Sequence, residues 1–122
     1  MKRLCVVLGA LTLAGCATDL AYQGPAQPSS QTAVIVGASP INAGLPMAPI
    51  LRKVDDLVVS WRYSRVAVLP GQHALLVDCV MGASTIRYHL VVMAEPGHRY
   101  VLTPVSGVGN HACTAVSIED QK

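Results

Sequence analysis

Phenylalanine is absent from this sequence of 122 residues, tryptophan occurs once, and only 13% of the residues are charged. The formal net charge of +2 lacks the strong basic bias of a nucleic-acid-binding protein. There is no Gly-x-Ser-x-Gly turn, no phosphate-binding glycine loop, and no Cys-x-x-Cys or His-x-x-x-His pair. No enzyme class and no cofactor is therefore indicated. At 52% hydrophobic residues, however, the chain is too apolar to be disordered.

The N-terminus has the three-part layout of a secretory signal. Lys2 and Arg3 precede an apolar stretch at residues 4–13, and small residues follow. The stretch is too short to cross a bilayer, which takes about 20 apolar residues. A buried N-terminal helix is the alternative, but it explains neither the cationic start nor the small-residue end.

Leu13-Ala14-Gly15-Cys16 ends this region and resembles the lipobox of bacterial lipoproteins. The resemblance implies that Cys16 receives a diacylglyceryl group, that a signal peptidase removes residues 1–15, and that the new amine is acylated. Two or more acyl chains would hold the protein stably on a membrane. The residue after Cys16 is Ala17. In enterobacterial lipoproteins an aspartate at this position favours the inner membrane, so the resemblance implies that this protein lies at the periplasmic face of the outer membrane.

Processing would change the charge and cysteine counts. Removal of residues 1–15 takes two of the nine basic residues, which leaves seven bases against seven acids and a formal charge of zero. With Cys16 lipidated, Cys79 and Cys113 remain as a pair. In an exported protein such a pair is expected to form a disulfide, and a thiolate metal site is the alternative.

The mature chain divides into a tether and a β domain. Residues 16–32 are rich in Pro, Gly, Ser and Gln, which predicts a flexible tether. Residues 33–122 show short apolar alternations separated by turns, and no helical period. Residues 57–69 are strand-like but change phase, which predicts a bulge or bend near Ser64. We expect an all-β domain, a small antiparallel sandwich or barrel of six to seven strands.

Three segments of this domain suggest a family. Residues 50–56, 68–77 and 94–100 resemble the Val-Asp-Gly segment, the Pro-Gly-x-His turn and the Gly-x-x-Tyr turn of PEGA-type domains, with Asp56 in place of the glycine. The resemblance implies a β-sandwich module. Its motifs are structural, since proline presets φ and glycine takes a positive φ at turns.

Two sets of residues are candidate sites. Histidine is a common metal ligand, so His73, His98 and His111 are a candidate metal site. The simpler interpretation is that these histidines lie in turns and are solvated. An aromatic and cationic patch is the candidate binding surface, although the favoured interpretation of its aromatic residues is that they fill a core without phenylalanine. The patch comprises Trp61, Arg62, Tyr63 and Arg65.

The expected function follows from these features. We expect a lipid-anchored envelope protein with a non-catalytic binding or accessory role, its partner being peptidoglycan or another envelope protein. The alternative is a periplasmic metal-handling protein that uses His and Cys. Neither nucleic acid nor a cofactor is expected to bind.

Overall fold

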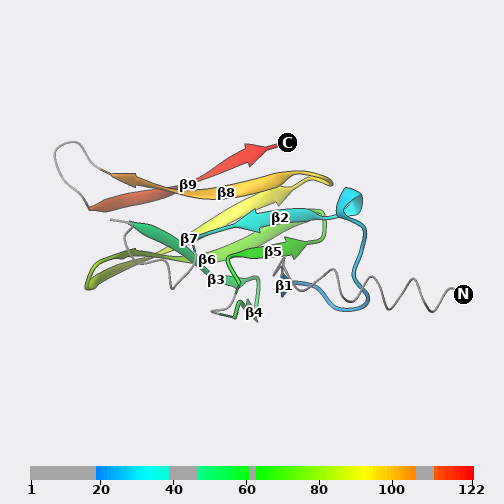
Figure 1. The fold of residues 1–122 in the computed structure, drawn as a ribbon, viewed down its shortest axis with the longest axis horizontal. Helices are drawn as coiled ribbons and strands as arrows, with labels where there is room; N and C mark the ends of the chain where they lie inside the picture. The colour runs from blue at the N-terminus through cyan, green and yellow to red at the C-terminus, as the bar shows by residue number, and fades with distance from the viewer. Residues whose placement is uncertain (1–18, 39–46, 61–62, 107–111) are drawn as a thin grey trace, which may run out of the picture.

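The computed structural model describes residues 19–38, 47–60, 63–106 and 112–122, which form two β-sheets that enclose one core (Figure 1). The predicted all-β sandwich is confirmed. Nine strands are described, two more than the upper expectation, because two of them have only two residues each. The strands are β1 (Asp19–Leu20), β2 (Ala33–Val36), β3 (Ala48–Val54), β4 (Leu57–Val58), β5 (Arg65–Val68), β6 (Gly71–Met81), β7 (Ser84–Ala94), β8 (Arg99–Ser106) and β9 (Cys113–Gln121).

The two sheets are mostly antiparallel. The first, sheet A, has the order β1-β5-β2-β8-β9, and the second, sheet B, has the order β4-β3-β6-β7. Two pairs in sheet A are parallel, β1 with β5 and β2 with β8. Among the described strands, the edges of sheet A are therefore β1 and β9, and those of sheet B are β4 and β7.

The longest element is the β6–β7 hairpin of sheet B. Its turn uses Gly82 at a φ of 58°, a conformation that costs glycine little. The predicted alternation in β6 is confirmed, since Leu75, Val77 and Cys79 are fully buried. Residues of sheet A, among them Ile35 and Tyr100, complete the same core.

Residues 57–69 form two strands in different sheets. β4 pairs with β3 at the edge of sheet B, and β5 lies in sheet A between β1 and β2. The predicted single strand with a bend near Ser64 is therefore wrong. The change of phase has another cause: the chain leaves one layer of the sandwich and enters the other.

Both ends of the described part of the predicted tether contact the domain. β1 pairs with β5, and the backbone N–H of Ala21 donates to Ala67 O at 2.9 Å. Thr32 is buried, and its carbonyl accepts from Gly97 N–H at 2.8 Å. Residues 19–32 are thus held at both ends, which the proline and glycine content did not indicate.

Cys79 and Cys113 form a disulfide with their Cα atoms 6.5 Å apart. Cys79 belongs to β6 and Cys113 to β9, so the bond connects sheet B to sheet A. Both residues are buried in the core. The disulfide interpretation of this pair thus agrees with the structure.

In the described part of the chain, no helix combines the length and the apolar character needed to cross a membrane.

Candidate functional site

The structure describes only some of the predicted site residues. Cys16, Trp61, Arg62 and His111 lie outside the described residues. The remaining candidates, apart from the disulfide, are Tyr63 and Arg65 of the aromatic patch and two histidines.

Tyr63 and Arg65 have different environments. Tyr63 is half-buried and packs against the core, as the alternative interpretation of the patch expects. Arg65 begins β5 and is exposed. These two residues alone do not define a binding surface.

His73 has no ring nitrogen available for a metal ion. Its Nε2 lies 2.6 Å from the carbonyl oxygen of Leu69, and its Nδ1 lies 2.7 Å from Asp55 Oδ2. Asp55 also accepts from Ala74 N–H, and the hydrogen bonds from His73 and Ala74 lower the pKa of its carboxyl group. His73 thus joins the turn after β3 to the turn before β6, which is a structural role.

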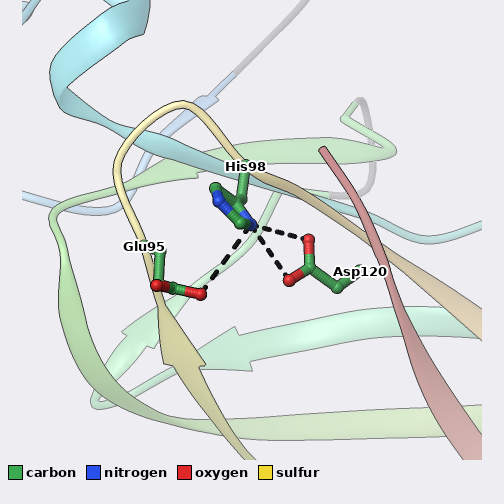
Figure 2. Close-up of side chains that lie close together, drawn as sticks. All are labelled: Glu95, His98 and Asp120. Atoms are coloured by element: carbon green, nitrogen blue, oxygen red, sulfur yellow. Dashed lines mark hydrogen bonds and ion pairs between the residues drawn. The ribbon is translucent and has the colours of Figure 1, made fainter.

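His98, in contrast, lies between two carboxylates (Figure 2). Its Nδ1 is 2.8 Å from Asp120 Oδ1, 3.0 Å from Asp120 Oδ2 and 3.9 Å from Glu95 Oε2. One potential ligand atom from each of the three residues lies within 4.8 Å of the other two. We call Glu95, His98 and Asp120 the carboxylate–histidine cluster.

Strands β2, β7, β8 and β9 position this cluster. Glu95 and His98 lie at the ends of the turn between β7 and β8, where His98 N–H donates to Glu95 O at 3.2 Å. The carbonyl of His98 accepts from Val34 N–H of β2 at 3.1 Å. Asp120 comes from β9, where it is the pairing partner of Tyr100 in β8. The cluster therefore depends on the register of sheet A.

Tyr100 supports the cluster through hydrogen bonds of its hydroxyl group. Its hydroxyl accepts from Glu95 N–H at 2.9 Å and donates to Met93 O at 3.2 Å. Its ring stacks beside that of His98, with centroids 6.1 Å apart. Burial raises the pKa of Tyr100, and the negative charges of Asp120 and Glu95 raise it further. The two hydrogen bonds of its hydroxyl thus hold the start of the turn that carries Glu95 and His98.

The cluster can bind a cation. Imidazole nitrogen and carboxylate oxygen are ligands of divalent transition metals. The side chain of His98 is only 16% exposed, whereas Glu95 and Asp120 are 62% and 44% exposed. The histidine is thus fixed, and the oxygen atoms remain open to solvent.

A second feature is the outer face of sheet B, where two hollows share Lys53 and Leu76. The larger has a volume of about 480 Å³, and its lining includes Arg52 and Arg87. Both arginines donate to Asp78, Arg52 at 3.0 Å and Arg87 at 2.9 and 3.2 Å. Mainly through the Arg87 hydrogen bonds, they lower the pKa of Asp78. We call this surface the basic face.

Neither Glu95 nor Asp120 was identified as a site residue from the sequence. The spacing Glu95-x-x-His98 across a predicted turn was a readable signal, since both residues flank Pro96-Gly97. Asp120 lies far along the chain, and only the pairing of β8 with β9 brings it to His98. Of the predicted histidine set, His98 belongs to this cluster and His73 does not, while His111 lies outside the described residues.

Comparison with known proteins adds no relative to this description: no family model, no curated protein and no solved structure matches the chain.

Proposed function

We propose that this chain is a lipid-anchored protein of the bacterial cell envelope, with a non-catalytic binding or accessory role at the periplasmic face of the outer membrane. The observation that carries the proposal is the order Lys2-Arg3, apolar residues 4–13 and Leu13-Ala14-Gly15-Cys16. The disulfide between β6 and β9 supports it, because disulfides persist in oxidising compartments such as the periplasm.

The short distance from Cys16 to β1 would determine where the domain lies. β1 begins at Asp19, three residues after Cys16, and three residues span at most about 10 Å. A lipidated Cys16 would therefore hold the sandwich against the headgroup layer, with its β1 edge nearest the membrane. The free tether of residues 16–32 expected from the sequence would be much shorter.

Replacement of Cys16 tests the anchor. We expect the protein from its native cells to have lost residues 1–15 and to carry acyl chains, and Cys16→Ser to be neither cut nor acylated, because lipidation requires the thiol. Intact-mass measurement and detergent partition check this result. Cys5→Ser is the matched control, since it removes a signal-region thiol outside the lipobox. An uncut and unacylated native protein would overturn the proposal.

The basic face is the surface we propose for partner binding. Of its three cations, Arg52 and Arg87 are paired with Asp78, whereas Lys53 borders both hollows and has no ion-pair partner among the described residues. A partner with acidic groups, such as peptidoglycan or an acidic envelope protein, suits this surface.

Crosslinking in native envelopes tests the binding role. We expect the protein to be recovered with one specific partner or with peptidoglycan, and Lys53→Glu to reduce that recovery because it reverses the unpaired charge. Lys122→Glu is the control, since Lys122 is exposed and lines neither hollow. If only lipid and abundant porins were recovered, the proposal of a specific partner would be wrong. If both variants recovered the partner equally well, the basic face would not be the binding surface.

A further inference from the structure

We infer that Glu95, His98 and Asp120 form a binding site for a divalent transition-metal ion, with Zn²⁺ as the expected ligand. The site is independent of the lipid anchor and of the basic face. Three lines of reasoning carry it: the spacing of the ligand atoms, the way in which the fold holds them, and the balance of charge around them.

The spacing suits a tetrahedral ion. Bonds of about 2.0–2.1 Å to nitrogen and oxygen place neighbouring ligand atoms about 3.3 Å apart in a tetrahedral site. The separations from His98 Nδ1, 2.8 Å to Asp120 and 3.9 Å to Glu95, lie on either side of this value. Figure 2 shows the two carboxylates meeting the same nitrogen of His98. Small side-chain rotations would therefore suffice to bind an ion.

The fold fixes the cluster before any ion binds. The turn that carries Glu95 and His98 is bonded to Tyr100 Oη through Glu95 N–H and to β2 through His98 O. A third bond joins Gly97 N–H to Thr32 O. Asp120 lies within the antiparallel β8–β9 pairing. Such supporting bonds orient ligands and reduce the entropy lost on metal binding.

The charge balance favours a cation. Two carboxylates converge on His98 Nδ1, which can donate only one hydrogen bond. No lysine or arginine within the described ranges forms an ion pair with Glu95 or Asp120. A divalent ion would neutralise both carboxylates, whereas a protonated His98 neutralises only one charge.

The ligand set favours Zn²⁺ over Ca²⁺ and Mg²⁺. Calcium takes six to eight oxygen ligands and magnesium an octahedral oxygen shell, and neither prefers imidazole. One nitrogen and two carboxylates satisfy three positions of a tetrahedral Zn²⁺ and leave the fourth to water. The solvent exposure of Glu95 and Asp120 is consistent with an open fourth position.

Zn²⁺ titration of the full protein tests the site. The protein is purified in detergent without a histidine tag, and binding is followed by calorimetry and by the rise in melting temperature. We expect one Zn²⁺ per chain with a micromolar dissociation constant and no comparable effect of Ca²⁺ or Mg²⁺. His98→Ala and Asp120→Asn should weaken binding by about tenfold or more. X-ray absorption should find one imidazole nitrogen among oxygen ligands.

Controls separate this site from other histidines. His89→Ala removes an exposed histidine of β7, and His73→Ala removes the histidine bonded to Asp55, so both should bind Zn²⁺ as the unchanged protein does. Asp120→Asn is nearly isosteric and keeps the β8–β9 pairing, so it remains informative if His98→Ala fails to fold. Absence of saturable Zn²⁺ binding would overturn the proposed metal site, and the cluster would then be only an ion pair between His98 and the two carboxylates. Binding that survives both cluster variants would overturn it equally.

Discussion

Asp78 shows how one residue organises the basic face. It is the only acidic side chain described as buried, and its two oxygen atoms accept from Arg52 and Arg87. Arg87 is its direct cross-strand partner in the β6–β7 hairpin. Arg52 reaches it because β3 has a register shift between Leu51 and Lys53, and the extra residue of such a bulge redirects its side chain.

Asp78→Asn should destabilise the fold and reduce its sensitivity to acid. The depressed pKa of Asp78 means that its ion pairs contribute stability above the ordinary value of 3.8. That contribution is lost as the pH falls below 3.8 through the lower pKa of the folded state. We therefore expect the variant to melt several degrees lower at neutral pH and to lose less stability than the unchanged protein on acidification to about pH 2. Thermal melts across this range measure both effects.

Asp56→Asn is the matched control for this prediction. Asp56 lies in the exposed turn after β3 and forms no ion pair with any described residue. Its replacement should leave the acid dependence unchanged. If Asp78→Asn and Asp56→Asn melt alike at all pH values, the two arginine contacts do not stabilise the fold.

Among the elements, those governed by local sequence were predictable. The two-residue turn at Gly82 pairs Met81 with Ser84, and counting outward from it places Asp78 opposite Arg87. The alternation in β6 and the turn at residues 95–97 follow from the same local rules. The sequence thus contained the hairpin, its register and one half of the Asp78 ion-pair network.

Elements that depend on distant pairing were not predictable. β1 and β4 have two residues each, which is too short for any periodicity. The parallel pairing of β2 with β8 joins segments more than sixty residues apart. The position of Asp120 opposite Tyr100 depends on the β8–β9 pairing, whose register shifts near Ser106. Two of the three members of the carboxylate–histidine cluster, Glu95 and His98, were therefore visible in the sequence, and Asp120 was not.

For the whole molecule, the disulfide has the widest effect, because it joins sheet A to sheet B. The core it crosses consists mainly of valine, leucine, isoleucine and alanine, with no phenylalanine. A small domain with such a core gains much of its stability from a crosslink. Cys79 and Cys113 are 34 positions apart, and closing a loop of that size contributes roughly 3–4 kcal/mol through chain entropy.

Loss of this bond should lower the free energy of unfolding by about 3–4 kcal/mol. We expect this in Cys79→Ala/Cys113→Ala, measured by urea unfolding against the unchanged protein. Reduction of the unchanged protein is the matched comparison, because it breaks the crosslink while keeping both sulfur atoms in the core. Any further decrease in the free energy of unfolding of the double variant therefore measures the lost packing of the sulfur atoms. A thiol assay should find neither cysteine free before reduction. Equal unfolding midpoints for the oxidised and reduced protein would show that the disulfide between the sheets does not stabilise the sandwich. Free thiols at both positions would instead favour the alternative that the two cysteines form a thiolate metal site.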